Sequence, residues 1–300
     1  MDARPHTARP AYRLGYTSAA FGFLAATAHI VGRRAAGWIA TTFAGFYCRT
    51  NPDLVALLDT NRKLLTGEKP PPGAGAENFR NFALTLADYL WLASQPPEVG
   101  FRLADLGPGI ESLREASADG SGAILATGHY GFFEFGALVL GQMGFPVSVV
   151  TFAEPSSELT RWRADYRRRW GAETIELGND AFSSLRANEA IDRGRLTAML
   201  IDRPLGGRSL EVDLPGGRIP FSLSPALLSW MTGCAVVPVS VRRTPAGRYA
   251  IRAGAAVRCD RSLPREESLS RCTREVASAL VADFRQDPSQ WYQFVPLTPP

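Results

Sequence analysis

One histidine of the chain stands close in sequence to a carboxylate, and the two residue types together can perform general base catalysis. The segment GHYGFFE, residues 128–134, lies between two apolar runs and holds both His129 and Glu134. A neutral imidazole can take the proton of an alcohol, while a carboxylate on the other ring nitrogen fixes the tautomer and stabilises the imidazolium that forms. We therefore expect His129 to act as a base and Glu134 to orient it.

The spacing of these two residues restricts how they can meet. Within one helix, five positions would place the side chains about 140° apart at roughly 100° per residue. They can meet only if His129 lies on a turn and Glu134 in the first turn of the following helix, and Gly128 and Gly131 permit such a turn. The amides of that helix N-terminus would suit an oxyanion or a phosphate. A turn histidine that makes only a local hydrogen bond stays open as an alternative.

Other chemistries find less support in the sequence. The remaining histidines lie in an arginine- and proline-rich tail (His6) and in an apolar run (His29). A G-x-S-x-G elbow is lacking, which counts against a hydrolase with a covalent acyl-enzyme. Neither a dinucleotide fingerprint nor a phosphate loop is present, and the four cysteines form no C-x-x-C pair. We expect no metal, no cofactor and no disulfide framework, as is typical of a reducing compartment.

The elements that must position His129 alternate between short apolar runs and longer amphipathic segments. Buried strands are expected at 123–127, 147–151, 196–201 and 235–241, with helices at 132–143, 158–170 and 181–193 between them. A hairpin is expected at 208–221 and a final helix at 264–283. This order predicts an α/β fold with a mostly parallel central sheet, and ligands of such sheets bind beyond the carboxyl ends of the strands, where His129 falls.

The first third of the chain has a different texture. Helices are expected at 51–66 and 77–94, separated by a proline- and glycine-rich loop. We divide the chain into an N-terminal helical, membrane-proximal segment (1–96) and an α/β domain (97–300), and expect the first to wrap the sheet as part of one structural unit.

The apolar stretch near the N-terminus allows several interpretations. Residues 14–32 carry no formal charge, which meets the length rule for a membrane span, but glycine, serine and threonine dilute them. Arginines 4, 9 and 13 before the stretch also fit a cleaved signal peptide. The aromatic residues of 21–47, bordered by arginines, suit a bilayer interface or an ordinary core. We favour a helix pair that packs in the domain or lies at a membrane surface.

The charge of the chain comes almost wholly from arginine. Of 33 basic residues only Lys63 and Lys69 are lysines, and the net charge is +4. The preference for arginine over lysine has two possible explanations. One is the nucleotide composition of the source; the other is binding of anionic partners, because the guanidinium group matches phosphate and carboxylate oxygens.

Five segments in order along the chain resemble one family, the bacterial acyltransferases of lipid A biosynthesis within the wider glycerolipid acyltransferase group. Residues 129–134 match its H-x4-D/E motif in the glutamate form. Residues 166–171 are similar to the family's helix end with an arginine before a glycine, and residues 199–204 are similar to its strand that ends in an acidic residue. Residues 219–238 are similar to the proline-bearing segment before the family's next strand. Residues 287–292 are similar to its tryptophan-bearing terminus. Arg203 follows the acidic residue where family members often have glutamine or histidine.

The resemblance implies transfer of a fatty acyl group from an acyl-carrier-protein or coenzyme A thioester to a hydroxyl of a lipid or glycolipid, such as a lipid A precursor. It implies catalytic His129 and Glu134, and a substrate-binding set of Arg167, Arg168, Asp202 and Arg203. Asp202 has two expected roles, as a carboxylate partner or as an acceptor for a sugar hydroxyl. The apolar residues that begin the helix after His129 are expected to line an acyl groove or to lie in the core.

The expected place of such an enzyme is the cytoplasmic face of the inner membrane, attached peripherally or weakly anchored, with no nucleic-acid partner. Two alternatives remain. The same chemistry could act on a phosphoinositide mannoside or a polyene lipid, or the chain could be a non-catalytic basic membrane-binding protein. An intact His129 and Glu134 favour an enzyme.

Overall fold

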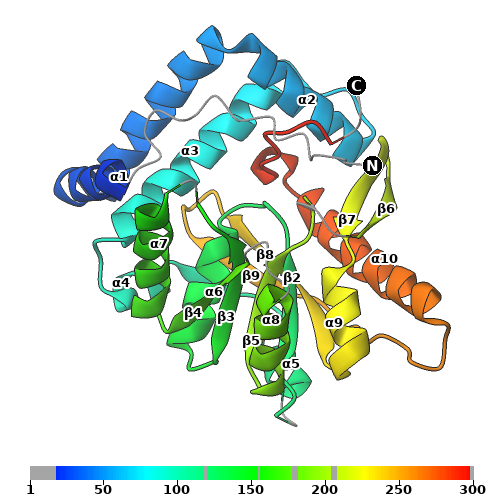
Figure 1. Cartoon of the computed structure of the whole chain (residues 1–300). Coiled ribbons are helices and arrows are strands. Elements are labelled where there is room, and N and C mark those ends of the chain that lie inside the picture. Colours follow the sequence, from blue (N-terminus) through cyan, green and yellow to red (C-terminus); the bar gives the residue numbers. More distant parts are fainter. Residues whose placement is uncertain (1–17, 118–119, 155, 178–181, 204–207, 298–300) are drawn as a thin grey trace.

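The centre of the molecule is a seven-stranded sheet (Figure 1). The computed structural model describes residues 18–117, 120–154, 156–177, 182–203 and 208–297. Within them the strand order is β1-β9-β8-β2-β5-β3-β4; β8 and β9 run antiparallel, and the other neighbouring pairs run parallel. The strands are β1 (Ala104–Leu106), β2 (Ala123–Thr127), β3 (Val147–Phe152), β4 (Ala172–Leu177), β5 (Leu196–Leu200), β8 (Ala235–Arg243) and β9 (Tyr249–Ala253). The expected mostly parallel α/β sheet is confirmed.

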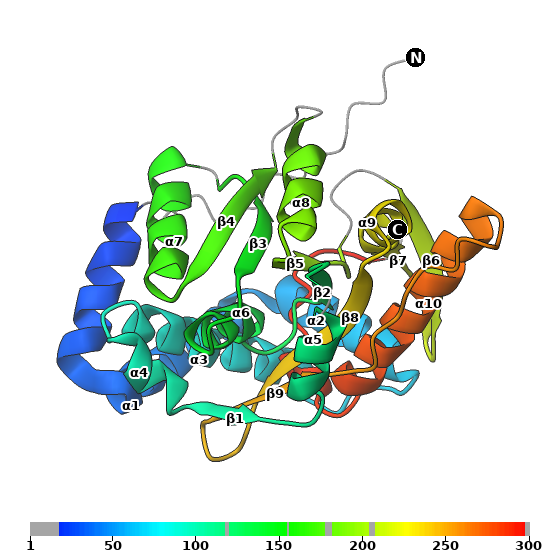
Figure 2. The ribbon, with the colours of Figure 1, turned by 90° about the horizontal axis from the view of Figure 1, so that it is seen from below.

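Helices cover both faces of this sheet (Figure 2). Alternate residues of the central strand β2 face two separate hydrophobic clusters: Leu125 belongs to the cluster that α6 fills, and Ile124 and Ala126 belong to the one that α10 fills. A strand buried on both faces reads as a continuous apolar run, which is why the sequence shows it clearly. The helices of the α/β part are α4 (Pro97–Phe101), α5 (Ile110–Ala116), α6 (Phe133–Gln142), α7 (Ser157–Arg169), α8 (Phe182–Asp192), α9 (Ser224–Thr232) and α10 (Arg265–Phe284).

The expected strands and helices of the α/β part form within one residue of their predicted bounds, except that β8 runs two residues further. The expected hairpin forms β6 (Ser209–Leu214) and β7 (Gly217–Ser222), which turn at Pro215 and Gly216. Three strands, β1, β4 and β9, were not expected. β4 carries the exposed Glu173 and Glu176, which point to opposite faces of the strand, and β9 carries the exposed Arg252, so neither reads as an apolar run.

Three helices lie above the seven-stranded sheet in Figure 1: α1 (Ser18–Thr50), α2 (Pro52–Thr66) and α3 (Ala74–Leu92). α1 bends at Gly32, whose φ of 79° and ψ of 161° are not helical, and glycine adopts such a positive φ without the cost that a side chain brings. Within the described ranges, none of the helices combines the length and hydropathy that a membrane crossing needs. The arginines on which the signal-peptide interpretation rested, and His6, lie outside the described residues.

Residues 288–295, near the end of the described chain, tie the helical layer to the sheet, and we refer to them as the C-terminal clasp. They begin with a short 3-10 helix, η1 (Pro288–Gln290). The side-chain amide of Asn78 in α3 donates to the carbonyl oxygens of Pro288 and Trp291 at 3.0 and 3.1 Å. Asn61 in α2 donates to the carbonyl oxygen of Gln293 at 2.8 Å. The clasp is therefore held by side-chain hydrogen bonds from the N-terminal helices α2 and α3.

Candidate active site

His129 lies on the loop between β2 and α6, at the carboxyl end of the sheet. The C-terminal clasp holds this loop by its backbone: the amide of Tyr292 donates to the carbonyl of His129 at 2.7 Å, and the amide of Gly131 donates to that of Gln290 at 2.8 Å. Both expected turn glycines are required. A Cβ on Gly128 would lie 2.7 Å from the Asp202 carboxylate, and Gly131 has a φ of 53°.

The carboxylate that contacts the His129 ring is Asp202. Nδ1 of His129 lies 2.8 Å from Oδ1 of Asp202, and the backbone amide of His129 donates to Oδ2 at the same distance. The two residues follow neighbouring parallel strands whose register pairs Thr127 with Leu200. Each stands two positions beyond its member of that pair, which brings them side by side.

Asp202 is held rigidly and kept ionised. Its side chain is completely buried, and Oδ2 also accepts hydrogen bonds from Nε1 of Trp291 at 2.9 Å and Nε2 of Gln293 at 2.7 Å. Burial acts to raise the pKa of Asp202, but the neighbouring imidazole and the hydrogen bonds from His129 and Trp291 outweigh it and hold the pKa below its ordinary value.

An ionised carboxylate can only accept, so Nδ1 of His129 must carry a hydrogen and, in a neutral ring, Nε2 has a free lone pair. The His129 side chain is 21% exposed, and Nε2 makes no hydrogen bond to any described residue. A ring with its tautomer fixed on one side and a lone pair available on the other is what a general base needs.

The pair that we expected, His129 with Glu134, does not form. Glu134 does lie in the first turn of α6, but its Oε1 accepts from Arg167 at 2.7 Å and from Arg163, both on α7. No hydrogen bond or ion pair joins it to His129 in the described part of the chain. The prediction that Glu134 orients the His129 ring by direct contact is therefore wrong. The reason is that α7 packs on the same face of the sheet as α6 and supplies two guanidinium groups to the Glu134 carboxylate.

Glu134, Arg163 and Arg167 form a buried ionic cluster. Burial acts to raise the pKa of Glu134, but the charges of Arg163 and Arg167 lower it to about 2. Arg163 also binds Glu154, so it bridges two carboxylates. The other oxygen of Glu134 is buried without a hydrogen-bond partner in the described chain. The cluster neutralises buried charge beside the His129 loop.

The four residues expected to bind substrate are placed differently from one another. The Arg167 side chain is 3% exposed and forms an ion pair with Glu134. The Asp202 side chain is buried and contacts the His129 ring, which agrees with the expectation that Asp202 is a carboxylate partner. Arg168 is 78% exposed and pairs with Asp165. Arg203 donates to the side chain of Gln293 and to the carbonyl of Tyr292 in the clasp. The structure holds no substrate, and their binding roles stay predictions.

The three phenylalanines near the start of α6 divide between core and site. Phe132 and Phe135 are buried and contact Tyr249, with ring centroids 5.1 and 5.0 Å apart. Phe133 is partly exposed and lies edge-on to the His129 ring at 5.6 Å. Of the three, Phe133 alone lies where an apolar side chain could touch a group bound at His129.

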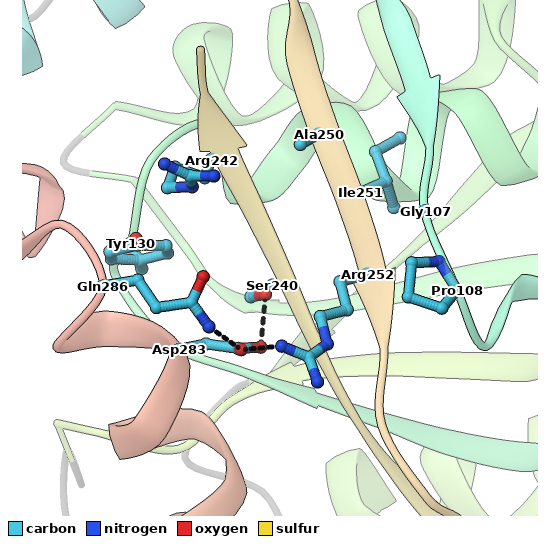
Figure 3. Close-up of a pocket in the computed structure, with 10 residues that line it drawn as sticks. All are labelled: Gly107, Pro108, Tyr130, Ser240, Arg242, Ala250, Ile251, Arg252, Asp283 and Gln286. Atoms are coloured by element: carbon cyan, nitrogen blue, oxygen red, sulfur yellow. Dashed lines mark hydrogen bonds and ion pairs between the residues drawn. The ribbon is translucent and has the colours of Figure 1, made fainter.

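A cavity of about 230 Å³ lies against β8 and β9, and Tyr130, the residue after His129, lines it (Figure 3). In its polar wall Asp283 accepts hydrogen bonds from Ser240, Arg252 and Gln286, and Arg242 also lines the cavity. The ring of Tyr130 lines it, and the Tyr130 hydroxyl has no partner among the described residues. His129 and Asp202 do not line this cavity, so we do not place the candidate active site in it.

No group of three or more potential metal ligands occurs within the described ranges, and all four cysteines carry free thiols. Two residues of the site were missed from sequence. Gln293 and Arg163 carry no motif of their own, although Arg163 stands one helical turn before Arg167, and that spacing places both on one face of α7. Trp291 was noted only as part of a family-like terminus.

Comparisons with known proteins agree with the resemblance. The sequence model of the bacterial lipid A biosynthesis acyltransferase family matches residues 28–297. Phosphatidylinositol mannoside acyltransferases from two strains of Mycobacterium tuberculosis, H37Rv and CDC 1551, are each 30% identical over 132 residues, which is 43% of this chain and 42% of the relative. The match spans less than half of the length of these curated relatives.

Proposed function

The chain belongs to the bacterial lipid A biosynthesis acyltransferase family, and from this premise we propose that it moves a fatty acyl group from a thioester to a lipid hydroxyl. The donor we propose is an acyl-carrier-protein or coenzyme A thioester. The acceptor is a lipid or glycolipid, of which a lipid A precursor is the first candidate. The observation that carries the proposal is the His129–Asp202 pair at the carboxyl end of the sheet.

The contacts of this pair suggest a sequence of proton and acyl transfers. Nε2 of His129 takes the proton of the acceptor hydroxyl, and the oxygen attacks the thioester carbonyl carbon. Asp202, ionised and fixed by the clasp, stabilises the imidazolium that forms. The C–S bond then breaks, the ester remains on the acceptor, and the departing sulfur takes the proton from Nε2. No covalent acyl-enzyme is needed.

The first turn of α6 supports the intermediate in this proposal. The helix begins at Phe133, four residues after His129, and no side chain caps it. Free amides at a helix N-terminus favour negative charge, so the tetrahedral oxyanion would be stabilised there. Glu134 then has a supporting role, in which its ionic cluster with α7 fixes the start of α6 beside His129.

A second acceptor is favoured by a specific observation. The curated relatives reported above are phosphatidylinositol mannoside acyltransferases, so a phosphoinositide mannoside is the second candidate. We propose the cytoplasmic face of the inner membrane as the place of reaction, since it is there that thioester donors and lipid acceptors meet.

The test is transfer of a labelled acyl group from acyl-carrier protein or coenzyme A to a panel of these acceptors. His129→Gln is expected to lower kcat by about 10²- to 10⁴-fold, the usual contribution of a general base. His29→Gln serves as the matched control, since His29 is exposed and its side chain hydrogen-bonds, among the described residues, to Gln95 alone. A folded His129→Gln protein with the wild-type rate would contradict the mechanism, and no transfer to any lipid from either donor would contradict the function.

A further inference from the structure

The cavity of about 230 Å³ against β8 and β9 has one wall formed by the sheet itself (Figure 3). The register of the two strands pairs Ser240 with Arg252. It likewise pairs Arg242 with Ala250. Residues that are paired, or that stand two positions apart on a strand, point to the same face of a sheet. These four side chains therefore share one face, and Asp283 stands beside it in the last turn of α10.

The wall of this cavity carries one positive charge in excess. The charged residues that line it are Arg242, Arg252 and Asp283, which give a net charge of +1. Asp283 accepts a hydrogen bond from Arg252 at 2.9 Å, so these two charges neutralise each other. Asp287, the next acidic residue along the chain, is hydrogen-bonded to Gln290 and does not line the cavity. The excess charge is therefore that of Arg242.

Arg242 has no counter-charge in the described part of the chain. It is half-buried, and its guanidinium group makes no hydrogen bond or ion pair with a described residue. The next residue differs, because Nε of Arg243 lies 3.8 Å from the carboxylate of Asp88. A cation that is partly withdrawn from water loses hydration, and without a counter-charge this loss is not compensated. An anion in the cavity would supply what Arg242 lacks.

Apolar groups form much of the remaining surface of the cavity. Figure 3 shows Tyr130 on the same side of the cavity as Arg242, with Pro108 on the opposite side. The Tyr130 ring is buried against Phe284 of α10, with ring centroids 4.9 Å apart, so this part of the wall is fixed. Sites for small molecules combine apolar walls with a few polar groups in this way. The cavity suits a ligand that carries an anionic group beside a short apolar part.

A carboxylate matches this site better than a phosphate does. The planar guanidinium group can donate two parallel hydrogen bonds to the two oxygens of a carboxylate. One negative charge balances the net charge of the wall, whereas a phosphate dianion would place an unbalanced charge near Asp283.

We propose that the cavity is a binding site for a small monocarboxylate with a short hydrocarbon tail. Arg242 holds the carboxylate, and Tyr130, Pro108 and Ala250 contact the tail. The site is separate from the proposed catalytic pair, since neither His129 nor Asp202 lines the cavity. The inference therefore does not depend on the proposed function.

The test is isothermal titration calorimetry of the full chain with hexanoate as the probe. Acyl donor and lipid acceptor are left out, so that failure of binding and failure of acyl transfer are read separately. Hexanamide has nearly the same shape without the charge, and inorganic phosphate has charge without the tail. We expect saturable binding of hexanoate and weaker binding of both other compounds. Absence of saturable hexanoate binding, or equally tight binding of hexanamide or phosphate, would overturn the proposal.

Two variants place the bound hexanoate in this cavity. Arg242→Gln is expected to weaken hexanoate binding by about ten- to hundredfold, because hydrogen bonds between charged groups are lost. Ala250→Leu keeps Arg242 and fills part of the cavity, and we expect it to weaken binding by roughly tenfold or more.

The matched control is Arg285→Gln, which removes the same charge from an exposed residue that does not line the cavity. It is expected to leave hexanoate binding unchanged. Circular dichroism checks that each variant is folded. Unchanged binding in folded Arg242→Gln or Ala250→Leu protein would overturn the proposal, because the probe would then be bound elsewhere. A loss in Arg285→Gln as large as in Arg242→Gln would also overturn it, since only the overall charge would then matter.

Discussion

Nδ1 of His129 lies 2.8 Å from Oδ1 of Asp202, although 73 positions separate the two residues in sequence. The carboxylate five positions away, Glu134, is instead bound to arginines of α7. The carboxylate that serves the base is therefore supplied by the neighbouring strand and not by the motif that contains the histidine.

Replacing the partner carboxylate by an amide gives the first prediction. In Asp202→Asn, the amide oxygen must accept the hydrogen bonds from the His129 amide, Trp291 and Gln293, so the NH₂ group faces Nδ1 of His129. The hydrogen of the imidazole then moves to Nε2, which can no longer act as a base. We expect kcat to fall by roughly 10⁴-fold with little change in fold, as for the comparable change in serine proteases.

The matched control for this variant is Asp213→Asn, because Asp213 is exposed on β6. Steady-state kinetics and circular dichroism of both variants provide the measurement. If Asp202→Asn kept more than a tenth of the wild-type kcat, the assignment of Asp202 to the base would be wrong.

The second prediction concerns Trp291, which holds Asp202 through the hydrogen bond that its Nε1–H donates. Trp291→Phe removes the Nε1 donor to Asp202, and we expect kcat to fall roughly tenfold with KM for the donor unchanged, because the base and not the binding site is disturbed. Trp230→Phe is the control, since Nε1 of Trp230 has no hydrogen-bond partner in the described chain. A rise in KM at constant kcat would point to a substrate-binding role instead.

Glu134 supplies the third prediction, on stability. Glu134→Gln leaves the buried guanidinium of Arg167 without its counter-charge, and we expect the free energy of unfolding to drop by about 3–5 kcal/mol. Removing both charges, in Glu134→Gln/Arg167→Met, is expected to restore part of this loss. Urea unfolding measures both. A double variant less stable than Glu134→Gln would show that the ion pair is not the source of the effect.

The fourth prediction is a pH dependence of stability with a definite sign. The pKa of Glu134 is about 2 in the folded chain and ordinarily 4.5, so the unfolded chain binds more protons between these values. The stabilisation is complete above pH 4.5 and is lost as the pH falls toward 2. Asp202, whose pKa is also lowered, acts in the same direction. Denaturation between pH 6 and 2.5 is expected to show a shallower loss for Glu134→Gln than for the wild type.

Two buried tyrosines give a matched pair for the fifth prediction. Tyr249 donates to Oδ2 of Asp88 at 2.6 Å, whereas the hydroxyl of Tyr130 has no partner among the described residues. Loss of a hydrogen bond to a charged group costs about 1.5–3 kcal/mol, and removal of an unsatisfied hydroxyl costs nothing. We expect Tyr249→Phe to lower the unfolding free energy by that amount and Tyr130→Phe to leave it equal or higher. Equal losses in the two variants would contradict this account of the buried hydroxyls.

Much of the local structure was predictable because it depends on neighbours in the chain. The central strands are buried on both faces and read as apolar runs, and the helices between them show helical spacing. The turn that carries His129 was predictable from Gly128 and Gly131, because their missing side chains allow the close approach and the positive φ found there. β4 was not predicted because it is an edge strand whose two glutamates are exposed and interrupt its apolar pattern.

The sequence by itself determined the α/β pattern and singled out His129, since both depend on residue type and short-range spacing. Which carboxylate meets the imidazole was decided by tertiary structure. β2 and β5 become neighbours only through the strand order, and their register aligns His129 with Asp202. Likewise Arg163 and Arg167 reach Glu134 only because α6 and α7 pack on one face of the sheet. Contacts of this kind join residues tens of positions apart, and nothing in local propensity or spacing encodes the distance between them.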